Sequence, residues 1–209
     1  MDDEPPFSER WRRWRQHIDL DEYQSRWDRL EAAGKTVHGE ADFVDRYATR
    51  RVLDAGCGMG RVALELAKRG YEVVGVDNDR QMLARAEARE SSAEWQLGDL
   101  TTVEFAGTFD TIVLAGDVML YVEPSRRHLV VPNLVRALEP GGCLICGSSF
   151  APPFTLVGYD DWCHFAGLEL TERYGSWERD PYRDEVNYAV SVHRAAEPEA
   201  GADPSGQPV

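Results

Sequence analysis

The chain has 209 residues and a formal net charge of −14, with 43% hydrophobic and 29% charged residues. This composition is typical of one folded domain with a sizeable core, with or without a small additional unit. The acidic excess argues against a nucleic-acid partner, because a phosphate backbone is bound mainly through lysine and arginine, and the lack of a run of about 18 apolar residues argues against a membrane span.

Two amphipathic helices are predicted near the N-terminus. The stretch SERWRRWRQH (residues 8–17) mixes tryptophans with arginines, as nucleic-acid-binding arms do, but one face of its helical wheel collects Phe7, Trp11, Trp14 and Ile18. The next segment has a similar stripe at Leu20, Tyr23, Trp27 and Leu30, and Asp19 can cap its helix. Residues 1–34 contain six arginines and nine acids, so this part of the chain is not a basic arm.

Short β-rich runs then alternate with helical ones. Strands are predicted at 51–55, 71–77, 93–99, 109–116 and 142–150, with helices at 61–69, at 82–88 and at 125–138. Because the strands are near-continuous apolar runs separated by helices, the pattern predicts a parallel sheet covered on both faces, in a doubly wound arrangement.

The pattern changes toward the C-terminus. A short helix at about 158–166 precedes two strands, 168–177 and 187–194, which no helix separates and which therefore predict an antiparallel pair. The tail 195–209 is rich in Ala, Pro, Gly and Glu, and we expect it to be disordered.

The N-terminus and the cysteines favour a cytoplasmic protein. The start of the chain, MDDEPPF, lacks the apolar segment of a signal peptide, and four scattered cysteines are too few for a disulfide framework. Cys143 and Cys146 form a C-x-x-C pair within a predicted strand, where positions three apart face opposite sides and do not clasp one metal. The five histidines show neither H-x-x-H nor H-E-x-x-H spacing, so no metal site is predicted.

A glycine-rich turn, LDAGCGMGR (residues 53–61), connects the first strand to the first helix of the alternating region. Gly56, Gly58 and Gly60 allow the backbone to approach a ligand closely. Asp77, at the end of the second strand, is placed to accept hydrogen bonds from the ribose hydroxyls of a nucleotide.

The spacing of this turn helps to select the nucleotide. A dinucleotide site requires G-x-G-x-x-G, whereas this sequence has G-x-G-x-G, and no G-K-[ST] follows as in a P-loop. Asp54 precedes the turn, and a carboxylate there suits an ammonium group better than a pyrophosphate. S-adenosylmethionine carries a nucleoside, an ammonium and a sulfonium.

The segment VLDAGCGMGRVALELAKRGYEVVGVDNDRQML resembles the first half of class I S-adenosylmethionine-dependent methyltransferases of the small-molecule type. GDL (98–100), FDTIVLAGDVMLYV (109–122) and LEPGGCL (138–144) resemble further motifs of that family, in the same order. The resemblance covers roughly residues 38–194. It implies a Rossmann-like, mostly parallel seven-stranded sheet with a C-terminal antiparallel pair, and S-adenosylmethionine as the cofactor.

The resemblance also implies roles for individual residues in cofactor binding. The three glycines would lie beneath the methionine portion with Asp54 near its amino group, Asp77 would hold the ribose, and the remaining contacts would come from Asn78, Met82, Asp99, Leu100, Ala115 and Gly116. Asp99 would accept from the adenine amino group. A solvated turn is the alternative interpretation for Asp99, and ordinary helix core the alternative for Met82.

Methyl transfer from a sulfonium is an in-line displacement, so a general base is needed only for a protonated acceptor. Asp117, Tyr121 and Glu123 follow the fourth predicted strand at the ligand-binding edge of the sheet, and His38 precedes the first strand. We consider His38, Asp117 and Tyr121 as candidate catalytic residues. Helix capping by Asp117 and a structural role for the histidine are the alternatives.

In the resembled family, N-terminal helices commonly cover the cofactor and the acceptor. Residues 1–37 are therefore predicted to form a helical lid, ahead of a methyltransferase domain at 38–194. Candidate lid and acceptor residues are Trp11, Trp14, His17, Tyr23, Trp27, Trp177 and Tyr182. Packing on the domain surface is the alternative role for these side chains.

We expect methyl transfer to a small-molecule acceptor, by a monomer or a homodimer that binds neither nucleic acid nor membrane. An RNA or protein methyltransferase and a non-catalytic S-adenosylmethionine-binding protein are the alternatives. The tetrapeptide APPF (151–154) differs from the D/N-P-P-Y/F motif of DNA amino-methyltransferases, because it begins with alanine and follows the fifth strand rather than the fourth.

Overall fold

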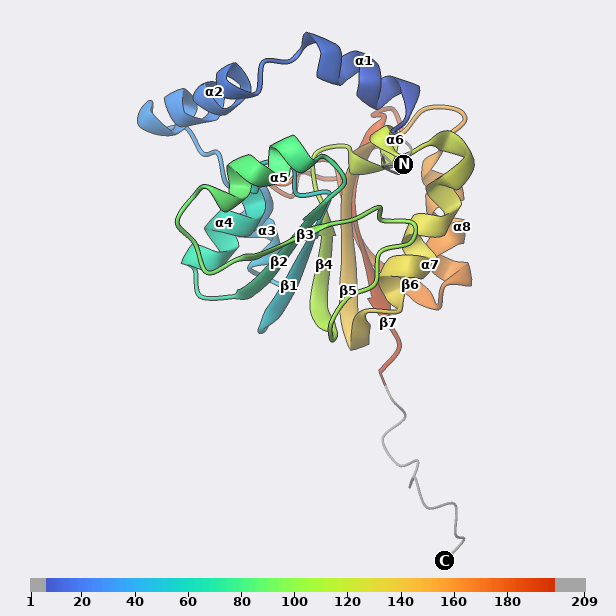
Figure 1. The fold of residues 1–209 in the computed structure, drawn as a ribbon. Helices are drawn as coiled ribbons and strands as arrows, with labels where there is room; N and C mark the ends of the chain where they lie inside the picture. The colour runs from blue at the N-terminus through green and yellow to red at the C-terminus, as the bar shows by residue number, and fades with distance from the viewer. Residues whose placement is uncertain (1–6, 198–209) are drawn as a thin grey trace, which may run out of the picture.

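The computed structural model describes residues 7–197, which form a seven-stranded sheet with helices on both faces and across one end (Figure 1). The helices are α1 (Glu9–His17), α2 (Leu20–Ala32), α3 (Gly39–Val44), α4 (Arg61–Lys68), α5 (Arg80–Glu87), α6 (Val118–Tyr121), the 3₁₀ helix η1 (Pro124–Leu129), α7 (Val130–Val135) and α8 (Leu156–Phe165). The strands are β1 (Arg51–Ala55), β2 (Glu72–Asp77), β3 (Glu94–Leu97), β4 (Phe109–Leu114), β5 (Leu138–Ser149), β6 (Leu168–Tyr174) and β7 (Tyr188–Ala195).

Most of the tail that was predicted to be disordered lies outside the described residues, and Ala195, the first residue of that predicted tail, ends β7. Across residues 7–197, no helix has both the length and the apolar character required to cross a bilayer.

The strand order is β3-β2-β1-β4-β5-β7-β6, which confirms the predicted doubly wound sheet. Strands β1 to β5 pair in parallel, whereas β7 pairs antiparallel with both β5 and β6. The chain order reverses between β1 and β4. The carboxyl ends of these two strands therefore border the crevice in which sheets of this kind bind their ligands.

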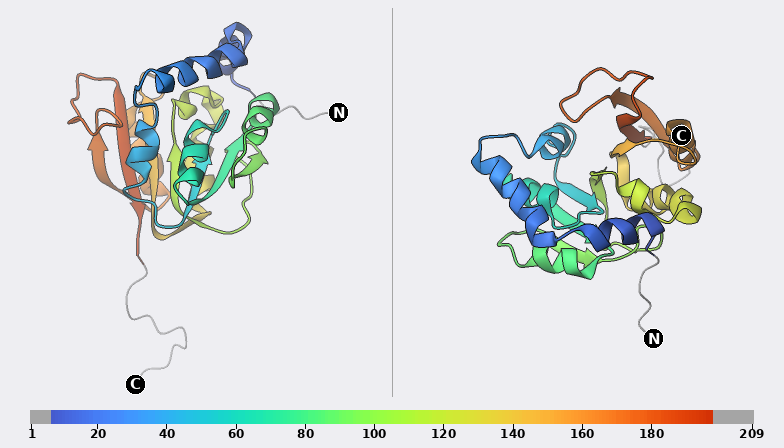
Figure 2. Two further views of the ribbon diagram at one scale, coloured as in Figure 1. Left: turned by 90° about the vertical axis from the view of Figure 1, so that its left-hand side faces the viewer. Right: turned by 90° about the horizontal axis from the view of Figure 1, so that it is seen from above.

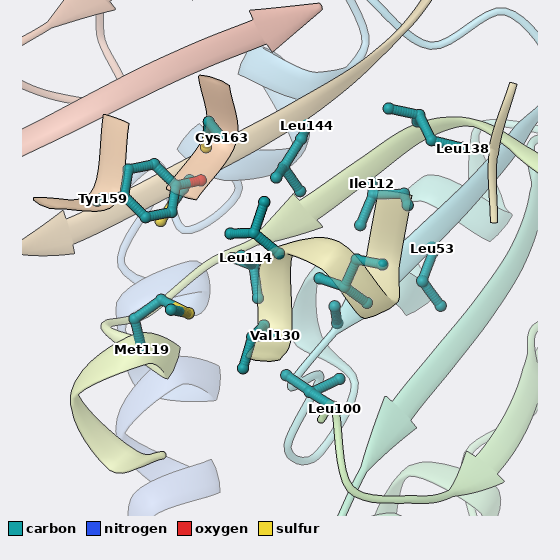
Figure 3. Packing of buried hydrophobic residues seen from close by; sticks show 14 of the residues in the cluster. Leu53, Leu100, Ile112, Leu114, Met119, Val130, Leu138, Leu144, Tyr159 and Cys163 are labelled. Atoms are coloured by element: carbon teal, nitrogen blue, oxygen red, sulfur yellow. The ribbon is translucent and has the colours of Figure 1, made fainter. Parts of the chain in front are cut away.

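Side chains of the central strands alternate between two cores. Val52 of β1 packs with α3 and α4 on one face of the sheet, and the adjacent Leu53 packs with α7 and α8 on the other (Figure 3). Cys143 and Cys146 of β5 also fall in different cores, as residues three apart on a strand must. Burial of both faces explains why the strands are continuous apolar runs in the sequence.

The segment 125–138, predicted as one helix, is broken into η1 and α7. Pro132 has no N–H to donate to a preceding turn, so it is tolerated only in the first turn of an α-helix, and α7 begins just before it. β5 begins at Leu138, earlier than predicted, because the Pro-Gly-Gly segment is incorporated into the strand as an irregularity in its pairing with β4.

Helices α1 and α2 lie across the carboxyl ends of the strands (Figure 2). Ser8 caps α1, because its Oγ accepts from the Trp11 N–H at 3.1 Å, and the same hydroxyl donates to the Tyr121 carbonyl at 2.5 Å. Asp19 caps α2 as predicted, by accepting from the backbone N–H groups of Asp21 and Glu22.

Two ion pairs join these helices to α5. Arg15 Nε lies 3.1 Å from Asp79 Oδ2, and Arg85 Nη2 lies 2.9 Å from Asp21 Oδ1. Asp79 is itself the N-cap of α5, so the first pair connects α1 to the end of the β2–α5 loop. The division of the chain into a lid and a domain at residue 37 remains a prediction.

Gly75 of β2 leaves space for the ring of Trp95 on the neighbouring strand, where an added Cβ would lie 2.5 Å from the ring. We expect Gly75→Ala to lower the free energy of unfolding by about 1–3 kcal/mol, the usual cost of overpacking, in urea denaturation. The double variant Gly75→Ala/Trp95→Leu should be less destabilised than the sum of the two single variants, because the smaller side chain removes the clash. Strictly additive effects would contradict this explanation.

Candidate cofactor and acceptor site

The glycine turn between β1 and α4 is held against the end of β2. Gly56, Gly58 and Gly60 have φ values of 82°, 56° and 79°, which residues with a Cβ rarely adopt. The N–H of Gly56 donates to the Val76 carbonyl at 2.8 Å, and the N–H of Gly58 donates to Asp77 Oδ2 at 2.8 Å. The turn therefore presents its backbone at the crevice between β1 and β4.

Two buried carboxylates lie beneath this turn. Asp54 accepts from the Ala63 N–H at 3.0 Å, and Asp77 accepts from the N–H groups of Gly58 and Asp79. Burial raises the pKa of Asp54 to about 7 and that of Asp77 to about 6, against the lowering effect of these hydrogen bonds. Neither carboxylate forms an ion pair with another described residue, so both are available to a ligand that carries a cation or hydroxyl groups.

A cavity of about 230 Å³ opens above the turn. Predicted site residues on its wall are Asp54, Gly56, Gly58, Asp77, Asn78, Met82, Asp99, Leu100, Ala115, Gly116 and Tyr121, together with Trp11, Trp14, Tyr23 and Trp27 from α1 and α2. Residues of the wall that the sequence did not single out are Gln24, Cys57, Met59, Arg61, Val62, Gly98, Thr101, Val118, Val122 and Arg126. Glu123, noted only as a polar candidate, also lines it.

The two candidate histidines lie outside this cavity. His38 precedes α3, and its Nε2 lies 3.7 Å from Glu65 Oε2 on α4. His17 is exposed at the end of α1, and its Nδ1 lies 2.7 Å from the Arg13 carbonyl. The structure therefore does not bring either imidazole together with the residues of the glycine turn.

Asp117 also lies off the cavity wall, although it is next to Gly116. Its φ of 62° is left-handed, and its Oδ1 accepts from the Ser149 N–H at 2.6 Å. The side chain makes no capping bond to α6. Asp117 thus ties the loop after β4 to the end of β5 and thereby positions the start of α6.

The other predicted site residues outside the wall pack against the domain. The Cβ that Gly60 lacks would lie 2.4 Å from the ring of Trp95. Trp177 packs edge-on against Phe43 at 5.4 Å, and Tyr182 packs against the core that contains α7 and α8. None of the three lines the cavity, although Gly60 lies between the wall residues Met59 and Arg61.

One end of the cavity contains an ion pair that the sequence did not predict. Arg126 Nη1 lies 2.7 Å from Asp99 Oδ2, while Asp99 Oδ1 accepts from the hydroxyl and the N–H of Thr101. Both Asp99 and Arg126 line the cavity. Arg126 comes from η1, far along the chain, and no spacing rule links it to the GDL motif.

Another part of the cavity wall is aromatic. We call Trp11, Trp14, Tyr23, Trp27 and Tyr121 the aromatic row, because each ring neighbours another within it. Ring centroids lie 5.4 Å apart for Trp11–Tyr121, 5.8 Å for Trp14–Tyr121, 5.8 Å for Trp14–Tyr23 and 6.3 Å for Tyr23–Trp27. All five side chains are half-buried and line the cavity. Burial raises the pKa of Tyr121, so its phenol stays protonated near neutral pH.

Arg61, the first residue of α4, fixes one end of this row. Its guanidinium lies 4.4 Å from the ring centroid of Trp27 and forms an ion pair with Glu40 of α3. It also donates to the Val37 carbonyl at 2.5 Å. This single side chain therefore connects α2, α3 and the chain between them to the glycine turn.

Comparisons with known proteins agree with this geometry. Residues 52–142 match the family model described as a methyltransferase domain. The glycine/sarcosine N-methyltransferase of Parasynechococcus marenigrum is 28% identical over 140 residues, which are 60% of this chain and 49% of that protein. The chain aligns with about half the length of the first curated relatives that it matches.

Solved structures extend the match over most of the chain. A SAM-bound amino pentose methyltransferase from Micromonospora echinaspora, CalS10, has a TM-score of 0.67 at 20% identity, over 86% of this chain and 98% of that one, which supports the fold alone. A TehB-like SAM-dependent methyltransferase from Corynebacterium glutamicum is 33% identical, with a TM-score of 0.77, over 85% of this chain and 97% of that one. The chain therefore belongs to the S-adenosylmethionine-dependent methyltransferases, with S-adenosylmethionine as its cofactor.

Proposed function

We propose that the chain transfers the methyl group of S-adenosylmethionine to a small-molecule acceptor by in-line displacement. The observation that carries this proposal is the cavity that extends from the buried Asp54 and Asp77 to the aromatic row beneath α1 and α2. A cavity between two helices and a sheet edge suits a small molecule or the end of a larger one. The net charge of −14 further disfavours RNA as the acceptor.

The names of relatives offer limited support for a small acceptor. The glycine/sarcosine N-methyltransferase and the amino pentose methyltransferase are both named for small molecules. A cypemycin N-terminal methyltransferase, 31% identical over 114 residues, is named for a peptide. A short peptide terminus therefore belongs in any acceptor panel used with this chain.

The residues beneath the turn fit the methionine and ribose portions of the cofactor. Asp54 would face the cofactor ammonium, whose charge would offset the burial that opposes ionisation of this carboxyl group. Asp77 would accept from the ribose hydroxyls with the lone pairs that its two backbone donors leave unused. Gly56 and Gly58 would let the backbone lie against the methionine portion.

We propose that the remaining contacts to the cofactor come from other residues of the cavity wall. The adenine would lie between the segment of Asn78 and Met82 and the segment of Asp99 and Leu100, with the Arg126 ion pair holding the Asp99 carboxylate. Ala115 and Gly116 would line the methionine side, beyond the end of β4.

S-adenosylmethionine supplies an electrophilic methyl group on a sulfonium. The protein's contribution would be orientation and exclusion of water, which α1 and α2 provide as the roof of the cavity. Tyr121 would act as a hydrogen-bond donor, because a phenol is protonated near neutral pH and burial raises the pKa of this one further. Asp117 would position α6 through its bond to Ser149, away from the reacting atoms.

The proposal is tested by incubating the protein with S-adenosylmethionine and a panel of small amines, phenols, thiols, peptides and RNA, with mass spectrometry of the products. We expect S-adenosylhomocysteine to form only when a small molecule is present and becomes methylated. Tight cofactor binding without product on any acceptor would favour a non-catalytic binding protein.

Replacement of Asp77 should weaken cofactor binding. We expect Asp77→Asn to lower the affinity for S-adenosylhomocysteine at least tenfold in calorimetry, because hydrogen bonds to a charged group contribute about 1.5–3 kcal/mol. Glu72→Gln, at the exposed start of the same strand, is the matched control and should bind as the parent does. An unchanged affinity in Asp77→Asn would exclude Asp77 from the ribose site.

Asp54→Asn should stabilise the cofactor-free protein at alkaline pH. An unfolded aspartate ionises near pH 3.9, whereas burial keeps Asp54 protonated up to about pH 7, so its ionisation destabilises the fold as the pH rises. Between pH 5 and pH 8 this cost is about 2–3 kcal/mol, at 1.36 kcal/mol per pKa unit. In urea titrations, the free energy of unfolding of Asp54→Asn minus that of the parent should increase by about 2–3 kcal/mol from pH 5 to pH 8. The affinity of the variant for S-adenosylhomocysteine should fall.

The control for this pH dependence is Asp110→Asn. Burial opposes ionisation of Asp110, but the N–H groups of Thr49, Arg50 and Arg51 outweigh it and hold its pKa below the ordinary value. Asp110 is therefore ionised throughout the range, and its replacement should change stability by an amount that does not vary with pH. If the stability of Asp54→Asn also differed from that of the parent by an amount independent of pH, the raised pKa assigned to Asp54 would be wrong.

A further inference from the structure

The aromatic row crosses the place where methyl transfer would occur. Tyr121 belongs to α6, directly after β4, and Trp27 contacts Arg61, directly after the glycine turn. The row therefore spans the crevice between the carboxyl ends of β1 and β4, where the strand order reverses. All five rings line the same cavity as the glycine turn and Asp77, so they are within reach of a molecule bound beside the cofactor.

The rings at the two ends of the row already contact cations of the chain itself. The Arg61 guanidinium lies 4.4 Å from the centroid of Trp27, and the Arg10 guanidinium lies 5.9 Å from that of Tyr121. Both distances are within the range of cation–π attraction. Among the described residues, no cation lies over the three central rings, Trp11, Trp14 and Tyr23, although all three line the cavity.

The charges on the cavity wall favour a cation and disfavour an anion. The two basic side chains of the wall are each committed to an acid, Arg61 to Glu40 and Arg126 to Asp99. Among the acids of the wall that we do not assign to the cofactor, Glu123 has no such partner in the described part of the chain. No lysine or histidine is part of the described wall. The wall therefore offers no imidazole to deprotonate an acceptor and no uncommitted cation to bind an anionic one.

We propose that the central rings of the aromatic row, Trp11, Trp14 and Tyr23, bind a small amine that is cationic in water, and that its nitrogen is the methyl acceptor. This inference rests on the proposed methyltransferase function and specifies its substrate class. Aromatic faces in an acidic, partly desolvated pocket attract ammonium groups, whereas a phenolate, a carboxylate or a phosphate would be repelled.

An amine also fits the proton and charge balance of the reaction. The ammonium first releases its proton to solvent, and the nitrogen lone pair then forms the new N–C bond while the C–S bond breaks. The electron pair of that bond stays on sulfur, so a neutral thioether leaves and the positive charge moves from sulfur to nitrogen. While the amine is neutral, the positive charge of the reacting pair lies on the sulfonium, and after transfer it lies on the methylated nitrogen beneath the aromatic row. No general base of the protein is required.

A pair of isosteric probes tests this proposal without turnover. Choline and 3,3-dimethylbutan-1-ol have the same shape and hydroxyl group, but only choline is charged. We expect choline to bind at least tenfold more tightly than the neutral alcohol in calorimetry, both with and without saturating S-adenosylhomocysteine. Equal affinity, or a preference for the alcohol, would overturn the proposal in favour of a neutral acceptor.

Variants of the aromatic row test whether its rings cause the preference for choline. Trp14→Leu should reduce the preference for choline to less than threefold, whereas Trp14→Phe, which keeps an aromatic face, should retain most of it. Trp162→Phe is the matched control, because Trp162 of α8 packs against Phe154 away from the cavity, and it should bind both probes as the parent does. A choline preference unchanged in Trp14→Leu would also overturn the assignment.

The two proposals fail in different ways. If S-adenosylhomocysteine does not bind, the methyltransferase function is wrong, and the preference for choline measured without it still decides whether the row binds cations. If S-adenosylhomocysteine binds but choline has no advantage, the amine acceptor alone is wrong.

Discussion

The hydrogen bond from the Gly58 N–H to the Asp77 carboxylate, 2.8 Å long, connects the glycine turn to the end of β2. The rest of the site depends on it, because it places the turn, the first residue of α4 and the β2–α5 loop in one rigid arrangement. Asp77 also accepts from the Asp79 N–H, and Asp79 in turn caps α5 and pairs with Arg15 of α1. One buried carboxylate thereby links the sheet edge to the helices that cover it.

The cost of this arrangement is the burial of two acids close together. Asp54 and Asp77 both have raised pKa values because they are removed from water, and each contributes to the raised pKa of the neighbouring Cys57 thiol. A ligand that brings an ammonium and ribose hydroxyls would relieve this cost. A turn with a purely structural role needs neither buried acids with raised pKa values nor several glycines with positive φ.

The helices α1 and α2 are held to the domain by a small number of polar contacts and by their apolar faces. Met59 of the turn and Met82 of α5 form a small core with Leu20, against which Trp11 and Trp14 pack. The same rings pack on the domain and line the cavity, and their role toward an acceptor remains a prediction. Two arginines of α1 make specific contacts, since Arg15 donates to Asp79 and Gln81 and Arg13 pairs with Glu9.

The sequence by itself indicated the fold and the elements that carry the turn, because buried parallel strands are continuous apolar runs and Gly56, Gly58 and Gly60 are neighbours in the chain. It indicated the cofactor through the spacing of these glycines, the place of Asp77 at the end of β2 and the resemblance to a known family. The prediction of one helix over 125–138 was wrong although Pro132 argues against it, because a proline in the interior of a helix removes a hydrogen bond; the sequence did not fix where η1 ends and α7 begins. It also did not reveal Arg126 beside Asp99 or Arg61 beneath Trp27, since these pairs join residues that only the fold brings together. The candidate residues His38 and Asp117 were chosen for their chemistry and their place in the chain. Only the tertiary structure decided that their side chains contact Glu65 and Ser149 outside the cavity, because the direction of a side chain depends on the packing of neighbouring elements.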